Sequence, residues 1–180
     1  MREVSVHERS IPYHLWLLVF PIVWQTLPKD QQVHLAKPLI ALLSREYHAR
    51  QAMQRPNVVQ AFLEAINVAQ PQPKIPSELI KFLGRTFNAW NIASHLLESH
   101  VLLFPHDWRC FHALSELYGG LGDADQLAGL WKYRSRCVDT RAGVAMAQQG
   151  FLEGAQDVFL HAINTRLAKL NQAERLGAWW

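Results

Sequence analysis

Histidine and cysteine are the side chains of this sequence that could form a metal site. The chain has nine histidines and two cysteines. His95 and His100 are five residues apart, which places them on different faces of a helix, whereas the zinc-binding pair of a metalloprotease helix is four apart. Cys110 follows His106 by one helical turn, but His112 points elsewhere and no second pair of ligands follows. We therefore expect no metal site and interpret these residues as packed or exposed side chains.

Serines and a glycine-rich stretch raise the question of nucleophilic catalysis or phosphate binding. Ser94, Ser99 and Ser115 lie within helical patterns and not at a strand-to-helix turn, where a hydrolase exposes its nucleophile. Residues 119–122 read Gly-Gly-Leu-Gly, but Asp125 occupies a position where the nucleotide-binding fingerprint requires glycine or alanine. We expect an interhelical turn there, no cofactor, and no enzymatic activity in this segment.

The residues best suited to binding a partner begin at position 131. They are Trp131, Lys132, Tyr133 and Arg134, with Arg141 further on. Interleaved aromatics and cations occur in nucleic-acid grooves, and tryptophan, tyrosine and arginine are enriched in protein interfaces. The alternative is a helix end whose cations offset the negative end of the helix dipole. We favour this structural interpretation, with Trp131 packing as a core residue. A protein interface formed by residues 131–134 comes second and a nucleic-acid site third.

The composition describes a folded, apolar chain. Of the 180 residues, 49% are hydrophobic and 18% are charged, which excludes a disordered polyelectrolyte. The net charge of +3 lacks the dense basic character of a nucleic-acid binder. Two cysteines cannot form a disulfide framework, so a reducing compartment is expected.

Helical spacing of apolar residues recurs along the chain, and no stretch alternates with period two. Pro38 predicts a bend or break in the second helix, Asp107 and Asp123 are expected N-caps, and Gly122 and Gly150 are expected stops. The expected helices are 12–26, 28–52, 56–69, 77–86, 88–104, 107–121, 123–134, 138–149 and 151–168, with a last one from about Asn171.

The apolar run at residues 15–24 is too short to span a bilayer, which takes about 20 residues. It predicts a buried helix with a kink at Pro21. The hairpins expected at 107–134 and 138–168 resemble tetratricopeptide repeats and predict an all-α solenoid of stacked antiparallel hairpins. The chain ends in Trp179 and Trp180 without a polar cap, so we expect residues 1–180 to be one helical-repeat segment of a longer protein, or the product of a truncated gene model.

Several ordered stretches of the sequence resemble the FAT region of the TRRAP family. The stretches are 35–44, 55–61, 76–81, 88–90, 96–101, 129–132 and 140–143. The resemblance covers residues from about His14 to about Ala162, and the sequence departs from the family pattern at Tyr133 and after Ile163.

This resemblance implies that residues 1–180 are one segment of a much larger FAT domain. It implies a giant scaffold of the phosphatidylinositol-3-kinase-related class, built from HEAT repeats, a FAT region and a pseudokinase domain. It implies a nuclear transcription coactivator in histone acetyltransferase complexes such as SAGA. The partners it implies are subunits of those complexes, transcriptional activators, and adjoining regions of the same long chain. Two alternatives stay open: the FAT region of an active kinase of this class, and a free-standing tetratricopeptide-like adaptor.

Overall fold

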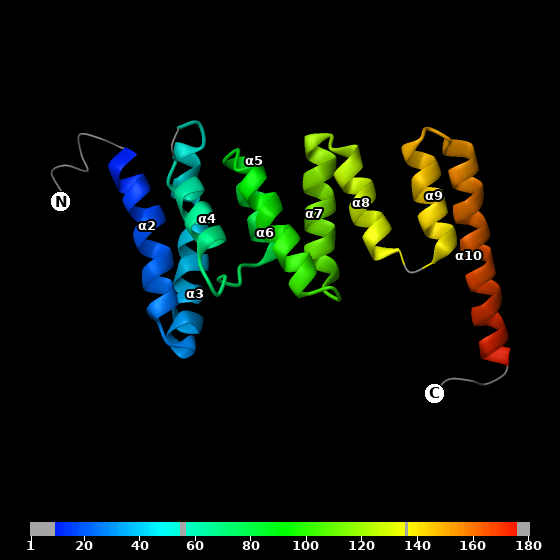
Figure 1. Cartoon of the computed structure of the whole chain (residues 1–180), viewed down its shortest axis with the longest axis horizontal. Helices are drawn as coiled ribbons and strands as arrows, with labels where there is room; N and C mark the ends of the chain where they lie inside the picture. Colours follow the sequence, from blue (N-terminus) through cyan, green and yellow to red (C-terminus); the bar gives the residue numbers. More distant parts are fainter. Residues whose placement is uncertain (1–9, 55–56, 136, 176–180) are drawn as a thin grey trace. The chain divides into compact units, whose positions relative to one another are not determined.

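The computed structural model describes residues 10–54, 57–135 and 137–175 (Figure 1). These residues form α-helices and one short 3-10 helix, and the described ranges contain no β-strand, so the predicted all-α class is confirmed. The elements are α2 (Ser10–Thr26), α3 (Lys29–Leu43), η1 (Glu46–Gln51), α4 (Val58–Val68), α5 (Ser77–Thr86), α6 (Trp90–Leu103), α7 (Trp108–Leu121), α8 (Ala124–Arg134), α9 (Val138–Gln148) and α10 (Leu152–Arg175).

The chain divides into two compact units, Met1–Leu117 and Tyr118–Trp180, and α7 crosses the division. Each repeat of a solenoid contacts only its neighbours, so a division of this kind arises within one repeat array as readily as between separate domains. The interpretation of residues 1–180 as a single helical-repeat segment therefore stays a prediction.

Helix α4 forms the centre of the first unit. It packs against α2, α6 and η1, and α5 packs against α6 (Figure 1). Val59, Leu63 and Ile66 recur at helical spacing on α4 and are fully buried, as are Leu96 and Leu97 of α6. Burial of each such side chain stabilises the fold by about 1.5–3 kcal/mol. The core of this unit is therefore the α4–α6 layer, and α2 covers one side of it.

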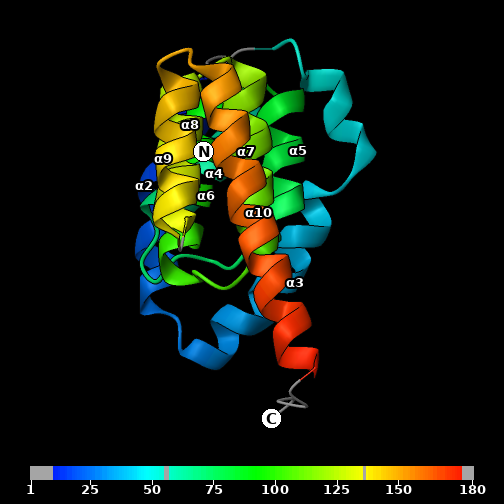
Figure 2. The ribbon, with the colours of Figure 1, turned by 90° about the vertical axis from the view of Figure 1, so that its right-hand side faces the viewer.

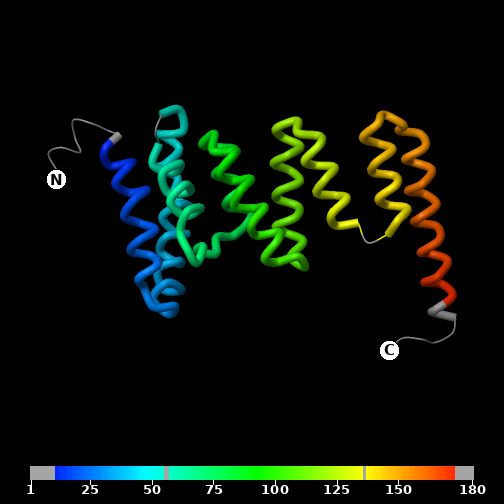
Figure 3. The backbone as a smooth tube through the Cα atoms, in the orientation of Figure 1, coloured from blue at the N-terminus to red at the C-terminus, as the bar shows by residue number. Residues whose placement is uncertain are grey.

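The second unit contains the helical hairpin of α9 and α10, with α8 packed against α9. Figure 2 shows α9 and α10 side by side, and Figure 3 traces the tight turn between them. Leu130, Ala155 and Ala162 are buried in this unit. The hairpin predicted for residues 138–168 is confirmed.

Most predicted helix boundaries agree with the structure because their capping residues act as expected. The Asp123 carboxylate accepts a hydrogen bond from the Gln126 amide at 3.2 Å, and that of Asp107 accepts one from the Arg109 amide at 3.0 Å. Gly122 and Gly150 follow α7 and α9 with φ of +72° and +84°, a left-handed conformation that favours glycine.

The predicted helix 28–52 is wrong, because the structure has two elements there. Pro38 lies inside α3, and the helix instead ends at Leu43. Both the amide and the hydroxyl of Ser44 donate to the Ile40 carbonyl, at 3.0 and 2.8 Å, and the next residue, Arg45, is extended. A serine hydroxyl that bonds the carbonyl four residues back weakens a helix slightly, and the extended Arg45 then takes the chain out of α3.

The predicted break before Asn171 is also wrong. α10 continues from Leu152 to Arg175, 24 residues in all. Residues 166–172 contain no glycine or proline and include good helix formers, so nothing local stops the helix. Pro56, with which the expected helix 56–69 begins, and the terminal pair Trp179 and Trp180 lie outside the described residues.

Candidate protein interface

Trp131 is half-exposed on α8. Its neighbour Leu130 is buried, whereas 48% of the Trp131 side chain is exposed. The Trp131 carbonyl accepts hydrogen bonds from the amide and hydroxyl of Ser135 at 2.9 and 2.7 Å, which closes the last turn of the helix. The expectation that Trp131 packs as a core residue is therefore wrong: the core position belongs to Leu130.

Trp131 lines a pocket of about 490 Å³ within the second unit. The pocket is predominantly apolar and is formed by residues of α8, α9 and α10 together with the turn that follows α8. The lining residues are Ala124, Leu127, Ala128, Trp131, Ser135, Thr140, Val144, Ala147, Gln148 and Phe159. A pocket of this size holds one or two large apolar side chains.

The other residues of the predicted interface belong to α8 but do not line this pocket. Lys132 and Arg134 are exposed, and Tyr133 is 60% exposed. Arg141 belongs to α9, but its Nε donates to the Ser135 carbonyl at 3.1 Å, which holds it at the end of the pocket. The structure thus brings Trp131 and Arg141 to one end of the same pocket.

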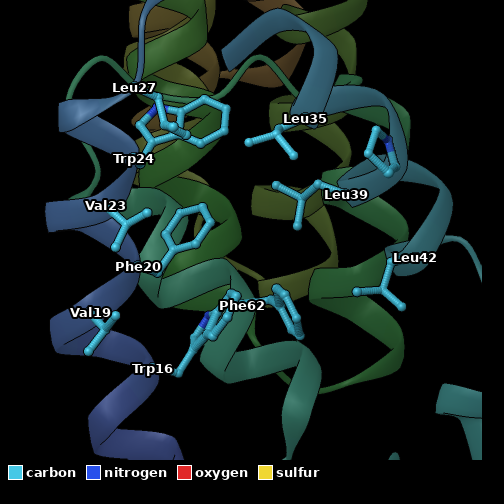
Figure 4. Close-up of a pocket in the computed structure, with 11 residues that line it drawn as sticks. Trp16, Val19, Phe20, Val23, Trp24, Leu27, Leu35, Leu39, Leu42 and Phe62 are labelled. Atoms are coloured by element: carbon cyan, nitrogen blue, oxygen red, sulfur yellow. The ribbon is translucent and has the colours of Figure 1, made fainter. Parts of the chain in front are cut away.

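A second apolar surface lies between α2 and α3, where a groove of about 410 Å³ opens. Figure 4 shows Phe20 and Val23 of α2 facing Leu35, Leu39 and Leu42 of α3 across this space.

The outward side of α2 is apolar as well, contrary to the expected fully buried helix. Its exposed residues outside the groove lining are Leu15, Leu18 and Ile22, which are 44–66% exposed. The signal for this surface was present in the sequence, because a helix that is apolar on every side requires partners on every side. None of the described helices has the length and apolar character that crossing a bilayer demands.

The side chains considered as candidates for catalysis or metal binding are dispersed. His100 is buried, whereas His95, His106 and His112 are exposed. Burial raises the pKa of the Cys110 thiol, and the nearby Asp107 adds to this, so the thiolate that a nucleophile or metal ligand needs is disfavoured.

The candidate serines and metal ligands do not form a site in the described ranges. The hydroxyls of Ser99 and Ser115 donate to carbonyls of their own helices, those of His95 and His112, at 3.0 and 2.9 Å. Ser94 is buried. Within 10–54, 57–135 and 137–175, no three His, Cys, Asp or Glu side chains are placed to hold a metal ion. The Gly119–Gly122 stretch ends α7 in a left-handed turn, as an interhelical connection does.

Comparison with known proteins shows where this helical framework belongs. A family described as "Tra1 HEAT repeat ring region" matches residues 1–69. The chain is 28% identical over 189 residues to the SAGA complex/NuA4 acetyltransferase complex subunit TRA1 of Saccharomyces cerevisiae, covering 99% of this chain and 5% of that protein. The chain is similar to TRRAP/Tra1 proteins along nearly all of its length. Similar TRRAP-family relatives include the transformation/transcription domain-associated protein of Homo sapiens, 28% identical over 170 residues, covering 83% of this chain and 4% of that protein. Another is the probable transcription-associated protein 1 of Dictyostelium discoideum, 32% identical over 117 residues, covering 63% and 3% respectively.

The predicted resemblance to the TRRAP family and the predicted helical-repeat solenoid are therefore confirmed. The chain spans only 5% or less of the length of these three relatives. Residues 1–69 match a HEAT repeat ring region, where we expected part of a FAT region. The FAT assignment of the remaining residues stays a prediction.

Proposed function

We propose that this chain is a non-catalytic scaffold segment of a transcription coactivator and acts through protein–protein contacts. The observation that carries the proposal is its similarity to subunits of the SAGA and NuA4 acetyltransferase complexes along nearly all of its length. We propose the nucleus as its place of action. Its partners are then subunits of histone acetyltransferase complexes, transcriptional activators, and adjoining HEAT, FAT and pseudokinase regions of one long chain.

The surfaces of the two units support a scaffold. Helix α2 exposes an apolar stripe beside the groove with α3, and the second unit has the apolar pocket beside Trp131. Exposed apolar patches of this kind mark sites of interaction with other protein surfaces. The candidate catalytic side chains of the described residues are buried, bonded within their own helices or dispersed, which supports a non-catalytic role.

The proposal is tested on the full-length protein that contains this chain, tagged and purified from its own cells. We expect histone acetyltransferase activity to co-purify with it. We also expect that the purified full-length protein itself transfers no labelled phosphate from ATP. Absence of acetyltransferase subunits from the purified complex would contradict the proposed scaffold role. Phosphate transfer by the purified protein itself would support the active-kinase alternative instead.

A matched pair of variants tests whether this segment contributes to assembly. Leu97 is fully buried in α6, and Leu102 of the same helix is 67% exposed. In the full-length protein, we expect Leu97→Asp to reduce recovery of the complex, because it places a charge in the core, and Leu102→Asp to leave the fold intact. Full recovery with Leu97→Asp would show that the segment is dispensable for assembly.

A further inference from the structure

The pocket beside Trp131 is suited to receiving a side chain from outside. Leu127, Ala128, Val144 and Phe159 supply apolar walls, and the half-exposed Trp131 stands at one end. Large aromatics that border a pocket of this kind dominate the energy of protein interfaces because they bury much area at little entropic cost. An apolar pocket alone, however, does not say what enters it.

The charges around the pocket are separated by sign. At the end formed by Ser135 and Thr140 lie Lys132 and Arg134 on α8 and Arg141 on α9. One carboxylate, Asp139 in the first turn of α9, accompanies these three cations.

The opposite end of the pocket is acidic. It is formed by the start of α8 and the end of α9, where Ala124 and Gln148 line the pocket. Asp123 caps α8, Asp125 lies in its first turn, and Glu153 lies in the first turn of α10. The sequence has no lysine or arginine at positions 119–131 or 142–165, so no cation accompanies these carboxylates along the neighbouring chain. The two ends are about 16 Å apart, the length of the 11-residue helix α8 at 1.5 Å per residue.

We infer that this pocket is a docking site for a short segment of a partner protein with an apolar anchor between an acidic end and a basic end. The apolar anchor of the bound segment enters between Trp131 and Phe159. The acidic end of the segment lies toward Arg141, and its basic end lies toward Asp123. Charge complementarity of this kind orients a bound segment and excludes partners of the wrong pattern. A nucleic acid does not match, because its phosphates would approach the acidic end as well as the basic end.

This inference rests on the proposed function, since it names the kind of partner that a scaffold would bind at this pocket. The test uses the full-length protein in its purified complex, with a photo-crosslinking amino acid at Gln148, an exposed residue of the pocket lining. The control is the same amino acid at Asp157, an exposed position of α10 outside the lining. We expect Gln148, and not Asp157, to crosslink to one segment of another protein with basic residues near the crosslink and an apolar anchor beyond them.

Two further variants separate docking from folding. Trp131→Ala should lower the crosslink yield at least about tenfold, the loss typical of an interface anchor. Lys132→Glu should lower it severalfold at low salt and less at high salt. Equal crosslinking at Gln148 and Asp157, or crosslinks at Gln148 only to nucleic acid, to a second copy or to the same chain, would overturn the inference.

The outcomes for the pocket and for the proposed function are distinguishable. Failed crosslinking in a complex that retains histone acetyltransferase activity overturns the docking site alone. A specific crosslink in a complex that lacks this activity supports the docking site and contradicts the proposed coactivator function.

Discussion

Gly143 of α9 lies so close to Phe159 of α10 that a Cβ atom on Gly143 would come within 2.6 Å of the Phe159 Cε1 atom. The same ring lines the pocket beside Trp131. Because Gly143 has no side chain, α9 and α10 can approach each other closely at this point. This close approach positions the Phe159 ring, which forms one wall of the pocket.

We expect Gly143→Ala to destabilise the second unit. Overpacking costs about 1–3 kcal/mol, and the better helix propensity of alanine offsets up to about 1 kcal/mol of this. Gly129→Ala on α8 is the matched control, because nothing lies within 4 Å of a Cβ there. Urea denaturation should show a lower free energy of unfolding for Gly143→Ala and an equal or higher one for Gly129→Ala. Equal behaviour of the two variants would contradict the close approach.

A second close contact holds α5 against α6. A Cβ on Gly84 would lie 2.5 Å from the Cβ of Ala93, and both residues are buried. We expect Gly84→Ala to destabilise the first unit by about 1–3 kcal/mol. Adding Ala93→Gly should relieve the clash, so the double variant should be more stable than the sum of the two single effects predicts. Strict additivity in a double-mutant cycle would show that the helices separate without cost.

Stability should decrease as the pH is lowered, because of His100. Burial, and to a smaller extent the nearby Lys74 ammonium, lowers the pKa of His100 below its usual 6.5, while Asp107 acts in the opposite direction. The unfolded chain therefore binds a proton at this residue at a higher pH than the folded chain does. The stability contributed by neutral His100 is present above pH 6.5 and is lost as the pH falls below that value toward the folded pKa.

The measurement is the melting temperature of the chain and of His100→Gln between pH 5 and 8. We expect the chain to lose more stability than the variant over this range. The lowered pKa of Glu116, held down chiefly by its hydrogen bond from Lys81, acts below the usual 4.5 and so outside this range. Parallel curves for the chain and the variant would exclude His100 as the cause.

Trp131→Ala should lower the free energy of unfolding less than truncation of a buried tryptophan does. Half of the side chain is already exposed, so its truncation should cost about 1 kcal/mol rather than the 3–5 kcal/mol of a core tryptophan. Leu97→Ala in the core of the first unit should cost about 2–5 kcal/mol. Thermal unfolding compares the two, and a loss at Trp131 as large as that at Leu97 would return Trp131 to a structural role.

The isolated chain should self-associate through α2. Its outward stripe exposes Leu18 at 66% and Ile22 at 64%, one turn apart. We expect Leu18→Glu combined with Ile22→Glu to lower the sedimentation coefficient toward that of a monomer, because charges oppose burial of the stripe. Leu102→Glu on α6 is the control for an exposed leucine outside the stripe. An unchanged distribution in the double variant would place the association elsewhere.

The sequence by itself determined the elements that depend on local interactions. The helical periodicity, the caps at Asp107 and Asp123, and the stops at Gly122 and Gly150 act within a few residues, so the sequence reveals them directly. One local signal in the sequence led to a wrong prediction of a helix boundary. Pro38 predicted a bend or break in the second helix, but α3 continues through Pro38 and ends at Leu43.

Tertiary structure alone decided which side of each apolar helix is covered. Leu130 and Trp131 are adjacent and both apolar, yet one is buried and the other borders a pocket, because the direction from which α9 and α10 pack is not encoded in the spacing along α8. The same holds for α2, whose apolar residues surround the helix while α4 covers one side of it. Burial depends on contacts between residues distant in sequence, and these become visible only when the helices are placed together in space.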